Sequence, residues 1–110
     1  MVIDAPALTA VLTGKADSST CLALFDTPPH ATTLTLLEVL ESLPHLEPRV
    51  ILDAMKGLDV IPVEVDLALI LEAKRKPLGS RDASLSAALA RRNRTSLITL
   101  ETGQVIAKTI

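Results

Sequence analysis

Short apolar segments that favour extended structure alternate with longer helical segments along this chain, and this alternation restricts the folds open to it. The segments that favour strands are residues 2–3, 30–34, 59–63 and 96–99. Strands that alternate with helices favour a parallel sheet with helices packed against both faces. We therefore predict an α/β fold, a three-layer sandwich around a central parallel sheet of four to five short strands.

The segments between these strands carry the signals that begin and end helices. Helices are expected at residues 6–12, 17–25, 35–43, 47–58, 65–74 and 81–92, and a last short helix at 103–108. Thr35 is the predicted cap of the third helix, because Glu38 follows it at the spacing of a capping box. Ser80 caps the helix that begins at Arg81. Pro62 lacks a backbone N–H group, so it places its strand at an edge of the sheet.

Composition supports one folded domain over residues 1–110 and excludes several classes of protein. Hydrophobic residues make up 48% of the chain and charged residues 22%, which is too apolar for a disordered segment. No apolar run of 18 residues is present, so we expect no membrane span, and the first 15 residues do not resemble a secretory signal. The single cysteine, Cys21, excludes an internal disulfide and indicates a reducing cytoplasm. Phe25 is the only aromatic residue, which excludes a platform for base stacking.

Charge is divided unevenly along the chain. Residues 1–73 carry a net charge of −8, whereas residues 74–94 carry +6 and enclose a single acid, Asp82. One interpretation is a pair of solvated helices with cationic surfaces. The other is an edge that attracts phosphate groups beside a carboxylate site.

Four acids fall at four predicted junctions between elements: Asp4, Glu38, Asp82 and Glu101. Asp4 ends the first strand and Glu101 follows the fourth, Glu38 lies in the first turn of the helix after the second strand, and Asp82 lies in the first turn of the helix after the loop at 77–79. In parallel sheets such junctions meet at the carboxyl ends of the strands, where ligands bind. Clustered carboxylate oxygens suit Mg²⁺ or Mn²⁺, and such ions promote in-line attack of water on a phosphodiester. Taken singly, each acid has another explanation, since acids are common in the first turns of helices and on surfaces.

Three segments resemble the motifs of PIN-domain ribonucleases, the fold of VapC-type toxins in toxin–antitoxin pairs. They are VIDAPAL at residues 2–8, LTLLEVLESL at 34–43, and SRDASLSAALARRNRTSLIT at 80–99. The resemblance covers about residues 1–107. It implies a PIN-like sandwich and a metal-dependent endoribonuclease in which Asp4, Glu38 and Asp82 hold Mg²⁺ or Mn²⁺. Glu101 matches the fourth acid and would assist directly or through water.

The resemblance also implies partners: RNA as substrate, a second copy in a homodimer, and a cognate antitoxin that covers the site. Five residues of the basic segment are the candidates for binding RNA phosphates: Lys74, Arg75, Arg81, Arg91 and Arg92. Apolar residues of the first helices, around Leu8, Val11, Leu12 and Leu24, are either contact sites for such partners or core.

Departures from the family pattern leave other functions open. Ala5 stands where the family usually has Ser or Thr, and Thr102 to Gln104 replace a further acid. One alternative is therefore a PIN-like domain that has lost catalysis and acts as a binding or assembly module. Another is a small regulatory α/β domain without a metal, if the four acids do not converge.

His30 and His45 do not have the spacing of a zinc site, and neither a GxSxG motif nor a Gly-rich phosphate loop is present.

Overall fold

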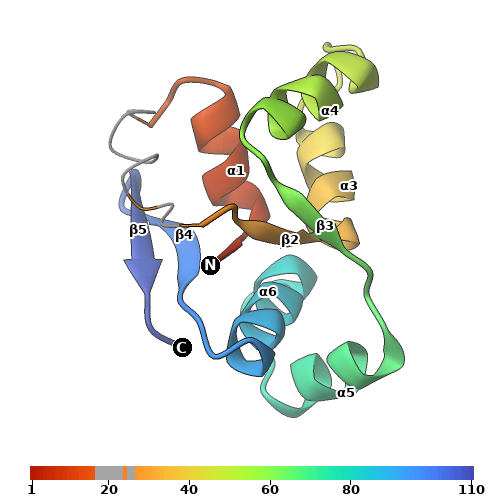
Figure 1. The fold of residues 1–110 in the computed structure, drawn as a ribbon, viewed down its shortest axis with the longest axis vertical. Coiled ribbons are helices and arrows are strands. Elements are labelled where there is room, and N and C mark those ends of the chain that lie inside the picture. Colours follow the sequence, from red (N-terminus) through yellow and green to blue (C-terminus); the bar gives the residue numbers. More distant parts are fainter. Residues whose placement is uncertain (17–23, 25–26) are drawn as a thin grey trace.

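The computed structural model describes residues 1–16, 24 and 27–110 (Figure 1). The predicted helix at residues 17–25 lies almost entirely outside these described residues. In chain order the elements are β1 (Val2–Ile3), α1 (Ala5–Leu12), β2 (His30–Thr32), α3 (Thr33–Ser42), α4 (Pro48–Gly57), β3 (Ile61–Val63), α5 (Leu67–Arg75), α6 (Arg81–Arg92), β4 (Leu97–Glu101) and β5 (Gln104–Lys108). No helix among the described residues is both long and apolar enough to cross a membrane.

The strands form one five-stranded sheet in the order β3-β2-β1-β4-β5. The first four are parallel, with Val2 of β1 opposite His30 on one side and Leu97 on the other. β5 pairs antiparallel with β4, so the sheet is mostly parallel rather than wholly so. β3 lies at an edge, as the missing N–H of Pro62 predicts.

Helices pack against both faces of this sheet, and the side chains of successive residues in one strand pack on opposite faces. Ile3 and Ile98 belong to a core cluster with residues of α1, α3 and α4. Val2 and Leu97, their neighbours in sequence, belong to a second cluster with residues of α5 and α6. This alternation is the period of two that a strand imposes on its side chains. The α/β prediction is confirmed, and the layers are compatible with a three-layer sandwich.

The prediction of a final helix at residues 103–108 is wrong, because this segment forms β5. Thr102 and Gly103 have positive φ angles of 49° and 78°, the conformation of a two-residue type I′ hairpin turn. This turn returns the chain alongside β4, where Val105 pairs with Leu100 and Ile106 with Thr99. The β-branched pair Val105-Ile106 suits a pleated strand better than a short helix.

The predicted start of the third helix is also wrong. α3 begins at Thr33, and its N-cap is Thr32, whose hydroxyl accepts a hydrogen bond of 3.0 Å from the N–H group of Thr35. Thr35 therefore lies inside the first turn, and Glu38 lies in the second turn rather than in a capping box. The helix starts earlier because β2 ends at Thr32, which leaves that residue in the extended conformation that a cap requires.

Candidate functional site

The site lies where the order of the strands changes direction. From β1 the chain adds β2 and then β3 on one side, and it later adds β4 on the other side of β1. The carboxyl ends of strands at such a switch point leave a crevice in which α/β proteins bind ligands. Asp4 follows β1 directly and is the N-cap of α1.

Asp4 is buried, with 4% of its surface exposed, and both of its carboxylate oxygens accept hydrogen bonds. Oδ1 accepts from the N–H group of Ala7 at 3.0 Å, which is the capping bond of α1. Oδ2 accepts from the hydroxyl of Thr99 in β4 at 2.5 Å. Burial raises the pKa of Asp4 above its usual value, the bonds from Thr99 and Ala7 oppose this rise, and the nearby charge of Asp82 adds to it.

Asp82 lies in the first turn of α6, which Ser80 caps, and only 1% of its surface is exposed. Its Oδ2 accepts a hydrogen bond of 2.9 Å from the N–H group of Ala5, directly beside Asp4 in the chain. Its Oδ1 accepts from the hydroxyl of Thr35. Three helices that are distant in sequence, α1, α3 and α6, thus meet at one buried carboxylate.

Thr35 is the centre of a buried group of hydroxyls that was not predicted from the sequence. Its single hydroxyl proton is donated to Asp82, so its oxygen accepts from Thr32 at 3.2 Å and from Ser86 at 3.3 Å. All four side chains are almost wholly buried. The available signals were the three-residue spacing from Thr32 to Thr35 and the four-residue spacing from Asp82 to Ser86, which places Ser86 on the same face of α6.

Glu38 lies in the second turn of α3, close enough to Asp82 for the two charges to interact. Its pKa is raised by partial burial first, and then by the charge of Asp82, while Arg81 opposes the rise and Glu41 adds to it. Glu38 also lines a pocket of about 380 Å³ with residues of α1, with Lys15 and with Leu100 of β4. Of the predicted acids, Asp4 and Glu38 therefore each lie within electrostatic reach of Asp82.

Glu101 has different surroundings. It is the last residue of β4, is exposed, and forms an ion pair of 2.8 Å with Lys108 of β5. In the part of the chain that the structure describes, no three His, Cys, Asp or Glu side chains lie close enough together to form a group that could hold a metal ion. The two buried aspartates nonetheless supply hard carboxylate oxygens, and neither takes part in an ion pair among residues 1–16, 24 and 27–110. Mg²⁺ is often bound by only one or two carboxylates together with water, so this donor set suits it.

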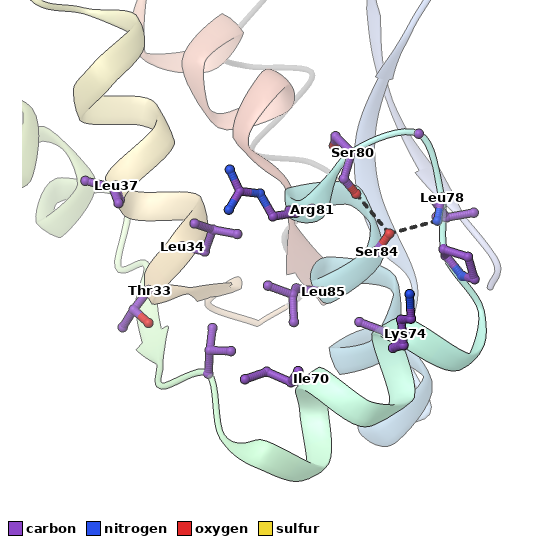
Figure 2. Close-up of a pocket in the computed structure, with 14 residues that line it drawn as sticks. Thr33, Leu34, Leu37, Ile70, Lys74, Leu78, Ser80, Arg81, Ser84 and Leu85 are labelled. Carbon is purple, nitrogen blue, oxygen red and sulfur yellow. Dashed lines mark hydrogen bonds between the residues drawn. The ribbon is translucent and has the colours of Figure 1, made fainter.

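The five predicted phosphate-binding residues divide into two groups. Arg92 forms an ion pair of 2.9 Å with Asp66, whereas Arg91 and Arg75 both approach Glu72, at 3.5 and 3.1 Å. Nine residues separate Arg91 from Asp82 on α6, which corresponds to about 13 Å along the helix axis. Lys74 and Arg81 instead line a larger pocket near the start of α6 (Figure 2).

A scan against the models of known protein families finds none that matches this chain, and no curated protein matches it. The resemblance to PIN-domain ribonucleases therefore rests on the three sequence segments alone.

Proposed function

We propose that this protein is a metal-dependent endoribonuclease with a PIN-like fold, the toxin of a toxin–antitoxin pair. The observation that carries the proposal is the burial of Asp4 and Asp82 as neighbours at the switch point of the sheet, with Glu38 within reach of the charge of Asp82. Two neighbouring carboxylates without a basic partner are costly in a protein interior unless a cation or a proton compensates them. The sequence resemblance supplies the choice of reaction.

Asp4 and Asp82 would hold Mg²⁺ or Mn²⁺, with Glu38 and Glu101 acting directly or through water. The ion, when bound, supplies charge stabilisation for the phosphodiester and favours in-line attack by water. Orientation of the carboxylates comes from the chain itself. The N–H groups of Ala5 and Ala7 and the hydroxyls of Thr35 and Thr99 fix all four oxygens of the pair.

Glu38 is the candidate for proton transfer in this proposal. Glu38 lines an open pocket, and partial burial together with the charge of Asp82 raises its pKa above its usual value, the direction that favours a general acid or base. Lys74 and Arg81 are the candidates for holding RNA phosphates, because neither forms an ion pair among the described residues. The single cysteine agrees with a cytoplasmic location for this activity.

Protein partners are part of the same proposal: a second copy of this chain and an antitoxin that covers the carboxylates. Support comes from α5, where Leu67 is 70% exposed and Leu71 is 54% exposed. Large apolar side chains that are exposed on one helix are typical of a surface that another protein covers.

Replacing Asp82 with Asn tests the proposed activity. An amide keeps the shape of the carboxylate, and its oxygen accepts from Ala5 while its NH₂ group donates to Thr35, so the fold should persist. The variant lacks the charge that a divalent ion requires. We expect Mn²⁺-dependent cleavage of a structured RNA to fall by at least about 100-fold, since the catalytic ion supplies several kcal/mol. We also expect Mn²⁺ to raise the melting temperature of the wild type and to affect the variant much less.

Asp66→Asn is the matched control, because it removes an aspartate charge at another helix N-terminus, outside the site. It should leave cleavage and the Mn²⁺ response unchanged. A wild-type protein that neither cleaves RNA nor responds to millimolar Mn²⁺ would contradict the proposal.

The second candidate is a binding or assembly module without catalysis. It is favoured by the fact that every carboxylate oxygen of Asp4 and Asp82 already accepts a hydrogen bond from the chain. In that case the aspartates would act as a clamp between α1, α3 and α6, and Asp82→Asn would change stability alone. Folded, RNA-inactive wild-type protein that forms a stable complex with a partner would establish this candidate.

A further inference from the structure

A groove of about 740 Å³ lies between α3, α5 and the first turns of α6. Figure 2 shows α3 and α5 on either side of the groove, with Arg81 and Leu85 of α6 between them. A volume of this size is within the range of sites for small molecules, about 300–1,000 Å³. The groove is a candidate binding site beside the carboxylates, and neither Asp4 nor Asp82 lines it.

The lining of the groove is mainly apolar, and part of it is exposed to water. Leu37, Ile70 and Leu78 line it and are 51%, 47% and 52% exposed. Leu34 and Leu85 add further apolar surface. Covering such side chains with an apolar ligand is favourable by about 25 cal/mol for each Å² removed from water.

The charged groups of the groove are all positive. Lys74 and Arg81 are the only charged residues that line it, and neither forms an ion pair among residues 1–16, 24 and 27–110. Arg75, in contrast, is paired with Glu72, although it follows Lys74 directly. An apolar groove lined by two cations and no acid is complementary to an anion with an apolar body.

One wall of the groove is held in place before any ligand binds. The loop at residues 77–79 is tied to α6, because Ser84 Oγ accepts a hydrogen bond from the N–H group of Leu78 at 2.8 Å (Figure 2). The same hydroxyl donates to the carbonyl oxygen of Ser80 at 2.9 Å. A wall that is already ordered costs less entropy on binding, which favours a defined site.

We propose that this groove binds a small amphiphilic anion: a single apolar chain that ends in a carboxylate. The chain lies against Leu37, Ile70 and Leu78, and the carboxylate pairs with Lys74 or Arg81. This inference does not rest on the carboxylate site, because neither Asp4 nor Asp82 lines the groove. It shares Lys74 and Arg81 with the RNA contacts proposed above, so the amphiphile and RNA would compete for these two cations.

Calorimetric titration of the full chain with octanoate, decanoate and dodecanoate, below micelle formation, tests the proposal. The chain lacks Trp and Tyr, so calorimetry and methyl NMR replace intrinsic fluorescence. Affinity should rise by roughly two- to fourfold for each added methylene and then level off once the groove is filled. Dodecyltrimethylammonium, which has the same chain and the opposite charge, should bind more weakly.

Matched variants separate the groove from the rest of the surface. Lys74→Gln and Arg81→Gln should each weaken dodecanoate binding by about two- to fivefold, the effect of a surface ion pair. Lys76→Gln removes a nearby exposed lysine that does not line the groove, and it should have no effect. Leu37→Ser should weaken binding, whereas Leu52→Ser, at a leucine of α4 that is also exposed, should not.

Three results would overturn the proposal. They are no binding of dodecanoate at millimolar concentration, equal binding of the cationic amphiphile, and equal loss of affinity in the groove variants and their controls. Circular dichroism of each variant shows whether it is folded, and Arg81→Lys, which keeps the charge, should retain the wild-type affinity where Arg81→Gln weakens it. A stable dimer in sedimentation that dodecanoate neither enters nor dissociates would also overturn it, since the groove would then be a contact between copies.

Discussion

Asp4 and Asp66 are both aspartates at helix N-caps, yet their surroundings shift their pKa values in opposite directions. Burial dominates at Asp4 and raises its pKa. Asp66 is exposed, and the bonds that it accepts from the N–H group of Leu69 and from Arg92 lower its pKa. The same residue type in the same local position thus responds to two different environments, which only the packing of the chain creates.

Replacing Asp4 with Asn should make the protein more stable at neutral pH in metal-free buffer. Because the folded-state pKa of Asp4 lies above its usual value of 3.8, the native state holds this proton to a higher pH than the unfolded chain does. The free energy of unfolding therefore falls as the pH rises through the raised pKa. Asn keeps the cap of α1 and does not titrate, so its advantage over the wild type should be larger at pH 7 than at pH 4.

Urea unfolding at the two pH values measures this difference, and Asp66→Asn is the comparison of opposite sign. The folded-state pKa of Asp66 lies below its usual value of 3.8, so the ionised carboxylate stabilises the native state at pH values above 3.8. This contribution is lost as the pH falls through the lowered pKa. Asp66→Asn should therefore cost more stability at pH 7 than at pH 3. If Asp4→Asn were less stable than the wild type at pH 7, the carboxylate would contribute more through its hydrogen bonds than burial costs.

At the scale of elements, the β4–β5 hairpin contains an unfavourable local conformation. Thr102 has a φ of 49°, in the left-handed region that β-branched residues avoid, whereas Gly103 at φ 78° has no side chain to clash. Pairing of β5 with five residues of β4 holds Thr102 in this state. The hairpin as a whole thus stabilises a conformation that its own turn residue disfavours.

Thr102→Asn should stabilise the protein by about 1 kcal/mol, because Asn adopts the left-handed conformation more readily and suits the first position of a type I′ turn. Thermal and urea unfolding of the variant measure this effect. Thr109→Asn is the control, since Thr109 is exposed, lies after the last strand and has no positive φ. Equal stability of the two variants would mean that the turn carries no strain.

At the scale of the whole molecule, the basic segment does not act as one surface. α6 separates its charges, with Arg81 at the helix start near the carboxylates and Arg91 and Arg92 at its end. The two C-terminal arginines approach acids of the α5 region, namely Glu72 and Asp66. Part of the positive charge that the sequence shows is therefore neutralised within the fold.

RNA affinity should consequently depend on Lys74 and Arg81 more than on Arg91 and Arg92. In an Asp82→Asn background that prevents cleavage, the double variant Lys74→Gln/Arg81→Gln should weaken binding to every RNA sequence alike. It should also flatten the dependence of log K on log salt, by about 0.7 for each phosphate of single-stranded RNA that the protein no longer neutralises. The double variant Arg91→Gln/Arg92→Gln should keep the wild-type slope. Filter binding between 50 and 200 mM salt measures the slope for both double variants. A flatter slope for Arg91→Gln/Arg92→Gln than for Lys74→Gln/Arg81→Gln would place RNA at the C-terminal end of α6.

Local patterns in the sequence determined most of the elements of this fold. The strand at residues 2–3, the edge position of Pro62, the helix cap at Ser80 and the alternation that defines an α/β sheet were all predictable. Each depends on side chains only a few residues apart, through strand or helix period, capping and the geometry of proline. The place of Asp4 at the carboxyl end of β1 followed from the same alternation. Asp82 begins α6, which follows α5 rather than a strand, so its approach to Asp4 and Glu38 depends on the packing of α6.

Only the tertiary structure decided the features that depend on contacts between distant segments. Residues 104–108 form a strand because β4 is available to pair with them, and a short apolar run does not by itself distinguish strand from helix. The hydrogen bond from Thr35 to Asp82 joins residues 47 positions apart, and the pairing of Glu101 with Lys108 requires the hairpin. The two buried aspartates and the divided basic segment have the same origin. Burial and charge pairing follow from the register and packing of elements that are far apart in the chain, and periodicity within one element does not encode them.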